Sequence, residues 1–433
     1  MSNLITRTIT GKDNAPVYFP TGIAIGNGIT GGINTIGIAG QQGFGVGICP
    51  QLPTGMSELF GTRDQSSDNY GNYSYTDGSI MVWIPAFVYK LVVNNVSIKS
   101  LSDFSSVTTA NAEGYALHRM FYNAGNVQAG IFVDKYKVSK NPNAAIASSL
   151  KNGNPLSSHA DHNPFSLVGA TNNFAGAITV AKSRGSKFHC NSIFTQKGLA
   201  LLSLAHGQAA SSPTYCAWYD SAKITNYPKG CNNNALGDVN DNSLAFISDG
   251  YLSCSKTGSA NFFAKTTHNG QNNGIADVNG CLWEISIGMT SDATNFYLLK
   301  SDANIETCTE GNTLATDLWG TAGIAALYSS IGATYGALTG SNSIKYFGST
   351  NQVFSAATSG NAWLATCAGI PLLTENTTQF GGDGVWDYKY NELCALSGGD
   401  WYYGGLAGVW GLDLDAVRGD SHTTVGCRAA LYL

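Results

Sequence analysis

The sequence predicts an α+β fold in which strands, turns and long loops outnumber helices. Only 12% of the 433 residues are charged, 52 are glycine, and aromatic residues make up 11%. Glycine and asparagine suit turns because they tolerate positive φ, and aromatic side chains suit the pleated face of a sheet. Aromatic and aliphatic residues are spread along the whole chain, which argues against general disorder.

The first part of the chain, residues 1–76, differs in composition from the rest. Residues 21–50 alternate glycine or small residues with isoleucine and valine at a period of nearly two. This pattern predicts short strands joined by glycine turns. Because glycine contributes no side-chain burial, we expect this Gly-rich β region to attach or oligomerise the protein rather than to form its own core.

The remaining residues, 77–433, predict one larger domain with long loop insertions. The apolar run at 79–89 (SIMVWIPAFVY) predicts a buried strand, and residues 130–139 (GIFVDKYKVS) predict another strand. Residues 195–208 predict a helix with Thr195 as its N-cap and an apolar stripe at Leu199, Leu202 and Ala205. A second, weaker helix is predicted at 317–338, and polar insertions at 141–186 and 223–273 predict loops.

The net charge and the cysteine spacing limit which partners the protein can bind and in which cellular compartment it is made. The net charge of −5 gives no electrostatic footprint for nucleic acid or an anionic membrane. No run approaches the roughly 20 apolar residues of a membrane span, and residues 1–11 have no signal-peptide core. We therefore expect synthesis in a cytoplasm and no membrane insertion. The ten cysteines contain no CxxC pair, which favours reduced, buried thiols over disulfides or a zinc site.

Four segments, in order along the chain, resemble the formylglycine-generating-enzyme type of C-type lectin fold. They are MVWIPAF at 81–87, FVDKYKVS at 132–139, DVNGCLWEI at 277–285, and GGDW at 398–401 followed by GCRA at 426–429. Within that superfamily, residues 68–85, residues 198–208 and the terminal AGVWGL and VGCRAAL are similar to the variable proteins of diversity-generating retroelements. The resemblance implies this C-type lectin fold for residues 77–433.

The resemblance also implies a function. Proteins of that family bind receptors from phage tail-fibre tips or bacterial surfaces, and unfaithful copying of adenines diversifies the 3′ end of their genes. The chain would then be a phage or prophage receptor-binding protein on the virion. It would form a homotrimer, contact phage tail proteins, determine host tropism and bind a host-surface protein or glycan. Three alternatives stay open: a structural tail-fibre protein whose lectin-like domain does not bind, a diversified binder on a bacterial surface, and a degenerate enzyme of the superfamily.

The C-terminal segment, residues 394–433, has the composition that such copying predicts. Adenine changes convert an AAC-type asparagine codon into many others, but never into one for Lys, Glu, Gln, Met or Trp. After Cys394 the chain contains no Lys, Glu, Gln, Met or Asn, although Asn is frequent up to Asn391. The predicted ligand-binding residues are those in this segment that an asparagine codon can reach: Asp400, Tyr402, Tyr403, Gly404, Leu406, Asp413, Asp415, Ala416, Gly419, Asp420, His422 and Thr424.

Scaffold residues are predicted to lie between them. Trp401 and Trp410 would anchor the segment, and Trp283 and Arg428 would support it from the motifs described above. Leu412 and Leu414 are expected to face inward on a strand, with Asp413 and Asp415 facing outward. The mixture of Tyr, Asp, His and Gly is typical of a paratope, because Tyr gives large contact area at low entropic cost. An ordinary exposed strand pair would alternate in the same way.

No catalytic site is predicted. Enzymes of the superfamily use a cysteine pair between their last two motifs, and this chain has none between Trp401 and Gly426. The loop GDVNDNS at 237–243 lacks the glycine and glutamate of an EF-hand and predicts an Asx turn. The Asn279/Glu284 pair allows a structural cation such as calcium, and no other cofactor is expected.

Two histidine positions have structural interpretations. His206 lies in the apolar helical segment and is expected to be a hydrogen-bonded core histidine. His159 and His162 (SSHADHN) have a spacing that could bind metal on a helix, but the Asn-Pro after them favours an exposed loop.

Overall fold

The computed structural model describes residues 24–25, 28–29, 33–93, 95–222, 226–307, 324–347, 354–372 and 382–433. Two six-stranded sheets form the framework of this part of the chain, and three-stranded and two-stranded sheets surround them. The α-helices within the same residues are few and mostly short. The prediction of a mixed α+β fold with low helix content is confirmed.

The first six-stranded sheet is antiparallel throughout, in the order β14-β24-β11-β5-β4-β3. Its strands are β3 (Met56–Glu58), β4 (Asn72–Tyr75), β5 (Ile80–Pro85), β11 (Gly130–Asp134), β14 (His189–Cys190) and β24 (Ala429–Leu431). All five residues of β11 are buried, because layers cover both faces of this central strand. The strands predicted at 79–89 and 130–139 are confirmed, the first as two strands separated at Ala86.

The second six-stranded sheet is mixed, in the order β19-β20-β22-β21-β15-β23. Its strands are β15 (Trp283–Ile285), β19 (Ser343–Tyr346), β20 (Gly384–Asp387), β21 (Leu396–Ser397), β22 (Leu412–Asp413) and β23 (Val425–Gly426). The pairs β20–β22 and β15–β23 are parallel, and the other neighbours are antiparallel. Three of its strands belong to the last forty residues.

Smaller sheets complete the architecture. The three-stranded sheets are β7-β6-β8 and β16-β17-β18, and the pairs are β1-β2, β9-β10 and β12-β13. Their strands are β1 (Ala24–Ile25), β2 (Gly28–Ile29), β6 (Phe87–Val92), β7 (Asn95–Ser100), β8 (Ala116–Leu117), β9 (Tyr122–Asn123), β10 (Asn126–Val127), β12 (Ser139–Lys140), β13 (Ala147–Ser148), β16 (Met289–Ser291), β17 (Phe296–Leu299) and β18 (Tyr328–Gly332). The pairing of β1 with β2 agrees with short strands in residues 21–50.

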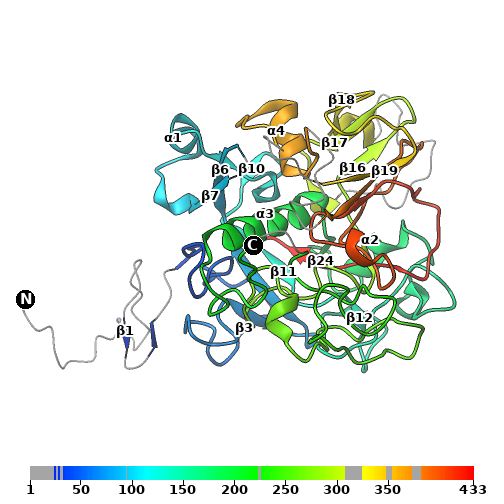
Figure 1. Ribbon diagram of the computed structural model, residues 1–433, viewed down its shortest axis with the longest axis horizontal. Helices are drawn as coiled ribbons and strands as arrows, with labels where there is room; N and C mark the ends of the chain where they lie inside the picture. The colour runs from blue at the N-terminus through cyan, green and yellow to red at the C-terminus, as the bar shows by residue number, and fades with distance from the viewer. Residues whose placement is uncertain are drawn as a thin grey trace, which may run out of the picture.

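The longest helix of the described residues, α3 (Ile193–Ala209), crosses the middle of the molecule (Figure 1). It is buried on every side from Ile193 to His206, so it has no solvent face. The predicted helix is confirmed, but its N-cap is Ser192, whose Oγ accepts from the N–H of Thr195 at 3.1 Å. Thr195 was the wrong cap because it lies inside the first turn. The other helices are α1 (Val107–Ala112), α2 (Gly176–Lys182) and α4 (Gly360–Cys367).

The helix predicted at 317–338 is not found in the described part of that range. Residues 324–327 form a single 3-10 turn, and Tyr328–Gly332 is strand β18, which pairs with β17. Residues 317–323 lie outside the described residues. The pairing with β17 buries Tyr328 and Ile331, and this tertiary contact outweighs a weak helical periodicity.

Residues 33–76 share the sheet and the core of the later chain. Strand β4 pairs with β5 across the expected boundary at residue 76. Ile36, Phe44, Val46 and Ile48 are fully buried in the main hydrophobic cluster. The structure therefore shows one continuous core on both sides of residue 76, and most of residues 1–32 lie outside the described residues.

Three of the four sequence segments that carry the family resemblance contribute a side chain to one buried ionic cluster. Arg428 contacts Glu284 through two hydrogen bonds, from Nε to Oε2 at 3.0 Å and from Nη2 to Oε1 at 2.9 Å. Lys137 Nζ lies 2.9 Å from the same carboxylate. Burial alone would raise the pKa of Glu284, but Arg428 and Lys137 lower it to about 2. Glu284 is thus ionised and ties β15 to the strands around Arg428.

Candidate functional site

The C-terminal segment, residues 394–433, is built into both large sheets. Strand β22 lies between β20 and β21, and β24 lies between β14 and β11. Strand β23 pairs in parallel with β15, with Trp283 opposite Val425. The segment is therefore a set of loops held at both ends by central strands, which is a rigid base for exposed side chains.

The four predicted scaffold residues are buried. Trp283 packs edge-on against Trp386, with ring centroids 5.3 Å apart. Trp410 lies against Phe347 and Phe354 at 5.3 and 5.0 Å. Trp401 belongs to a second, smaller hydrophobic cluster, and the guanidinium of Arg428 lies in the ionic cluster described above. All four were expected to be scaffold residues, and their part in holding a binding surface stays a prediction.

Buried polar side chains also form hydrogen bonds to the backbone of the C-terminal segment. Lys197 on α3 donates from Nζ to the carbonyl oxygens of Trp410 at 2.9 Å and Gly411 at 2.7 Å. The N–H of Trp410 donates to Asp383 Oδ2 at 2.9 Å. Burial raises the pKa of Asp383 to about 8 and lowers that of Lys197 to about 7. The sequence analysis predicted neither Lys197 nor Asp383, because Lys197 lies in a segment that predicts an ordinary helix.

The predicted ligand-binding residues divide into two sets. Eight have exposed or half-exposed side chains or backbone: Tyr402, Tyr403, Gly404, Leu406, Asp415, Gly419, Asp420 and His422. The other four are buried: Asp400, Asp413, Ala416 and Thr424. The expectation of exposure is therefore wrong for these four.

The reason is clearest at Asp413, which was expected to face outward. Strand β22 is central in its sheet, Asp413 is 8% exposed, and Tyr403 interacts electrostatically with both Asp413 and Asp400. Burial raises the pKa of Asp413 and of Asp400 to about 7. Asp413 instead shapes the backbone, because its Oδ1 accepts from the N–H of Asp415 at 2.7 Å.

Ala416 and Thr424 are buried because their backbone joins neighbouring strands. The carbonyl oxygen of Ala416 accepts from the N–H of Cys394 at 2.9 Å, and that of Thr424 accepts from the N–H of Trp283 at 2.9 Å. Leu412 and Leu414 face the core as predicted.

The exposed residues form two groups. In the first, the ring of Tyr402 stacks on Tyr403 with centroids 4.6 Å apart, and Tyr403 packs edge-on against Trp386 at 4.9 Å. Tyr402 is 45% exposed. Stacking on a half-buried partner fixes the exposed ring, which lowers the entropy lost when a ligand covers it.

The second group is carried by the loop from Asp415 to His422. Asp420 interacts electrostatically with both Asp415 and His422. The loop is anchored on the 157–164 segment, because the N–H of His422 donates to Ser158 Oγ at 2.9 Å and Ser421 Oγ donates to Ser158 O at 2.7 Å. Its acidic and imidazole side chains are thus presented from a fixed backbone.

Some residues that precede the C-terminal segment also belong to this second group. The sequence analysis did not predict them. Tyr390 is 38% exposed and hydrogen-bonds to the carboxylate of Asp415. Its ring lies 5.6 Å from that of Tyr388. His159 interacts with His422. The two tyrosines in DYKYNE, directly before the composition changes at Cys394, were the sequence feature that could have predicted this extension.

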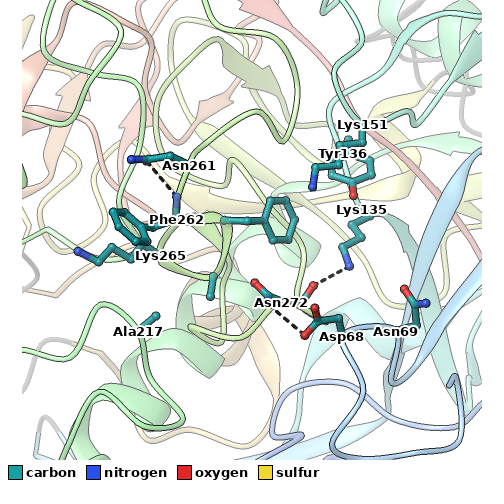
Figure 2. Close-up of a pocket in the computed structure, with 12 residues that line it drawn as sticks. Asp68, Asn69, Lys135, Tyr136, Lys151, Ala217, Asn261, Phe262, Lys265 and Asn272 are labelled. Carbon is teal, nitrogen blue, oxygen red and sulfur yellow. Dashed lines mark hydrogen bonds between the residues drawn. The ribbon is translucent and has the colours of Figure 1, made fainter. Parts of the chain in front are cut away.

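A separate concave surface lies elsewhere on the molecule (Figure 2). This cavity of about 620 Å³ is lined by Lys135, Lys151 and Lys265 together with Phe262 and Phe263, and none of its lining residues comes from 394–433. Lys135 points toward Asn272, whose carbonyl accepts from its Nζ at 2.7 Å, and Lys265 lies across the cavity (Figure 2). Sequence reasoning missed this site because its residues come from segments that are far apart along the chain.

The calcium site allowed at Asn279 and Glu284 does not fit the geometry. Both carboxylate oxygens of Glu284 face Arg428 or Lys137, so the carboxylate is already paired with protein cations. The 237–243 loop is an Asx turn as predicted, with the N–H of Asn240 donating to Asp238 Oδ1 at 2.8 Å. His206 is a buried, hydrogen-bonded histidine as predicted, 2.7 Å from Tyr215 O.

His162 is not in an exposed loop as expected. It is buried, and its imidazole stacks on Tyr251 with ring centroids 4.3 Å apart. The insertion at 223–273 covers it, which sequence spacing alone does not reveal. His159 keeps an intermediate exposure.

No protein-family model matches the chain, and no curated protein matches it. Among solved structures it is similar to variants of the major tropism determinant. The I1 variant gives a TM-score of 0.31 at 11% identity, covering 82% of this chain and 63% of that chain. The U1 variant gives 0.31 at 9%, covering 83% and 65%, and the M1 variant 0.29 at 11%, covering 82% and 63%. The chain therefore spans less than two thirds of each of these structures.

Among the described residues, no helix combines the length and the apolar character needed to cross a bilayer.

Proposed function

We propose that this protein is a diversified receptor-binding protein of a phage or prophage, which binds a host-surface ligand through its C-terminal segment. One observation carries the proposal: exposed Tyr, Asp and His side chains stand on loops whose backbone is fixed by buried strands, tryptophans and Lys197. Interfaces gain affinity when aromatic anchors are held rigid before binding. The segment has this construction, and after Cys394 it lacks Lys, Glu, Gln and Met, which adenine copying of an asparagine codon cannot produce.

We infer further that residues 77–433 have the C-type lectin fold of the formylglycine-generating-enzyme type. The support is the meeting of the four motif segments around Glu284 and Arg428, where each contributes a neighbouring strand or a buried charge. Under this proposal Asp400, Asp413, Ala416 and Thr424 vary less than the exposed eight, because their side chains are packed.

The proposal includes assembly on the virion. Residues 1–32 would attach the protein to phage tail proteins or join it into a homotrimer, since residues 33–76 are part of the main core. Several linked copies would raise the affinity for a cell surface through avidity. We propose no catalysis for the protein.

Two alternatives use the same fold differently. A structural tail-fibre protein would show the same frame without ligand binding, and a bacterial surface protein would carry the same binding segment in another setting. The lysine-lined cavity supports a third hypothesis, in which a small anionic group binds outside the C-terminal segment, because Lys135, Lys151 and Lys265 line it.

Binding of labelled full-length protein to intact cells across a panel of bacterial strains tests the proposal. Tyr402, Asp415 and His422 are changed together to Ala, since these three are exposed and their loss leaves the core intact. We expect binding to fall at least about tenfold, with the melting temperature nearly unchanged, because exposed substitutions cost little stability.

Phe262→Ala is the matched control, an exposed aromatic (52%) in the other cavity. It should bind like the wild type. Normal binding by the triple variant would refute the proposed surface, and loss of binding only in Phe262→Ala would move the site to the lysine-lined cavity.

Genome sequencing around the gene tests diversification separately. A nearly identical template repeat should carry asparagine codons at the variable positions, beside a reverse transcriptase gene. A locus without both would contradict the retroelement origin while leaving receptor binding to the cell assay.

A further inference from the structure

A cluster of buried ligand atoms lies beneath Trp401, where the 157–164 segment meets the insertion at 223–273. His162, Asp249 and Cys254 each offer one such atom, and the three atoms lie within 4.8 Å of one another. The side chains of His162 and Asp249 are 1% and 0% exposed, and Cys254 is 0% exposed. Polar groups buried this deeply need partners that satisfy them fully.

The two ring nitrogens of His162 both face acceptors. Nδ1 lies 2.8 Å from the carbonyl oxygen of Thr423, and Nε2 lies 2.7 Å from Asp249 Oδ2. A carbonyl oxygen can only accept, so Nδ1 carries the proton of a neutral ring. The lone pair of Nε2 would then face the carboxylate of Asp249, and the two would repel each other. A second proton on the ring or a cation shared between Nε2 and Asp249 removes this repulsion. This is the arrangement in which a backbone carbonyl orients a histidine that binds metal through its other nitrogen.

A second sulfur lies next to the cluster. Cys281 Sγ is 3.7 Å from Cys254 Sγ. Two thiolates that bind one tetrahedral zinc at 2.3 Å from the metal are about 3.8 Å apart. Nitrogen, carboxylate and thiolate ligands together suit zinc, whereas calcium and magnesium prefer oxygen alone.

The surroundings hold these donors in place. Asp249 accepts from Asn163 Nδ2 at 2.9 Å and from the N–H of Tyr251 at 2.8 Å. The ring of His162 is stacked on Tyr251 and lies edge-on to Trp401, with centroids 5.8 Å apart. The sulfurs of Cys254 and Cys281 lie in the smaller apolar cluster around Trp401. An apolar shell of this kind excludes water from the donors.

We propose that His162, Asp249 and Cys254 bind one zinc ion, and that the side chain of Cys281, whose Sγ lies outside this 4.8 Å group, moves in as the fourth ligand. Binding releases the two thiol protons and the proton between His162 and Asp249. The nitrogen and oxygen atoms move apart from 2.7 Å to about 3.3 Å, the separation of such ligands around one zinc ion. This proposal stands independently of receptor binding, and it departs from the expectation, drawn from cysteine spacing, that the chain has no zinc site.

Such a site would fix the base of the C-terminal segment. His162 contacts Thr423 directly, Trp401 packs on its ring, and Asp249 and Cys254 come from the insertion. Zinc would therefore join the insertion to the frame that carries Tyr402 and His422. It would act as a structural ion with all four positions filled by protein.

Titration of the full-length protein with Co²⁺, after chelation and under a phosphine reductant, tests the site. Thiolate-to-cobalt charge transfer reports sulfur ligands, and we expect it to saturate at about one equivalent per chain. Competition with Zn²⁺ should remove the band, and Zn²⁺ should raise the melting temperature because it binds only the folded site.

Variants and a matched control assign the ligands. Cys254→Ser and Asp249→Asn should each weaken metal binding by at least about tenfold, and Cys281→Ser should lower the charge-transfer intensity to about half. Cys49→Ser replaces another buried cysteine, 4% exposed, and should leave the titration unchanged. Near-ultraviolet circular dichroism of each variant checks that it is folded.

Three results would overturn the proposal. They are a folded wild-type protein that gives no cobalt band, an unchanged band in folded Cys254→Ser, and a disulfide between Cys254 and Cys281 found by mass spectrometry without reductant. The first result would leave His162 and Asp249 as a hydrogen-bonded ion pair.

Discussion

At the scale of single residues, Gly408 allows the backbone of the C-terminal segment to pass over the buried carboxylate of Asp383. A Cβ atom at this position would lie 1.9 Å from Asp383 Oδ1. Asp383 cannot move freely, because its other oxygen accepts from the N–H of Trp410. We expect Gly408→Ala to lower the free energy of unfolding by about 1–3 kcal/mol in urea titrations. Gly405→Ala is the control, since nothing lies within 4 Å of its Cβ, and equal losses in both variants would contradict this explanation.

Asp413 makes the stability of the fold depend on pH. Burial raises its pKa from 3.8 to about 7. Between these values the folded protein holds a proton that the unfolded chain has lost, so stability falls as the pH rises from about 4 to 7 and then levels. We expect Asp413→Asn to be more stable than the wild type at pH 8 by about 1–3 kcal/mol, with a smaller difference at pH 4.

Urea unfolding at pH 4, 6 and 8 measures this difference. Asparagine keeps the Oδ1 acceptor for the N–H of Asp415, so the loop geometry is preserved. Asp161→Asn is the control, because its side chain is 76% exposed. Asp400 and Asp383 retain part of the pH dependence in the variant, since their pKa values are also raised. A variant whose pH profile parallels that of the wild type would show that Asp413 is not the titrating group.

At the scale of elements, the ionic cluster joins strands that are far apart in the chain. Glu284 on β15 faces Arg428 and Lys137, and all three side chains are at most 2% exposed. Removing one charge leaves the others buried without compensation, so we expect Glu284→Gln to cost about 3–5 kcal/mol in the free energy of unfolding. Glu113→Gln breaks the exposed Lys99–Glu113 pair and should cost less than about 1 kcal/mol. Similar costs for the two variants would mean that the cluster does not stabilise the sheet.

Helix α3 and strand β22 show where sequence patterns were sufficient. Residues 195–208 were predicted as a helix from a candidate N-cap and an apolar stripe, although the helix begins at Ile193. Strand β22 was predicted with one exposed face, and Leu412 and Leu414 do face inward. Its other face is buried as well, since Asp413 is 8% exposed. The alternation of residues reports the two faces of a strand, but it does not report which later loop covers one of them.

At the scale of the whole molecule, residues 33–76 belong to the main core. A chain that begins at residue 33 keeps β3, β4 and the buried Phe44 and Val46, whereas one that begins at residue 77 loses them. We expect the first to unfold in a single thermal transition near that of the full chain. The second should lose this transition, because the edge of the first large sheet and its covering layer are gone.

Differential scanning calorimetry and analytical ultracentrifugation of both truncated chains measure fold and mass. If residues 1–32 join the subunits, the chain that begins at residue 33 should be folded and monomeric. A folded oligomer of the same mass as the full chain would place the subunit contact after residue 32. A native-like transition in the chain that begins at residue 77 would contradict the shared core.

The sequence by itself determined the mixed α+β class, the central strands at 80–85 and 130–134, the long buried helix and the buried tryptophans of the C-terminal segment. These features depend on local periodicity and on apolar side chains, which act within a few residues of one another. Tertiary structure decided which of the predicted ligand-binding residues are exposed, because Asp400 and Asp413 are buried by contacts that no local pattern predicts. It also brought His162 together with Asp249, Cys254 and Cys281, whose spacing along the chain matches no metal motif. Such sites form where loops that are distant in the sequence lie close together, and the tertiary fold alone determines which loops do so.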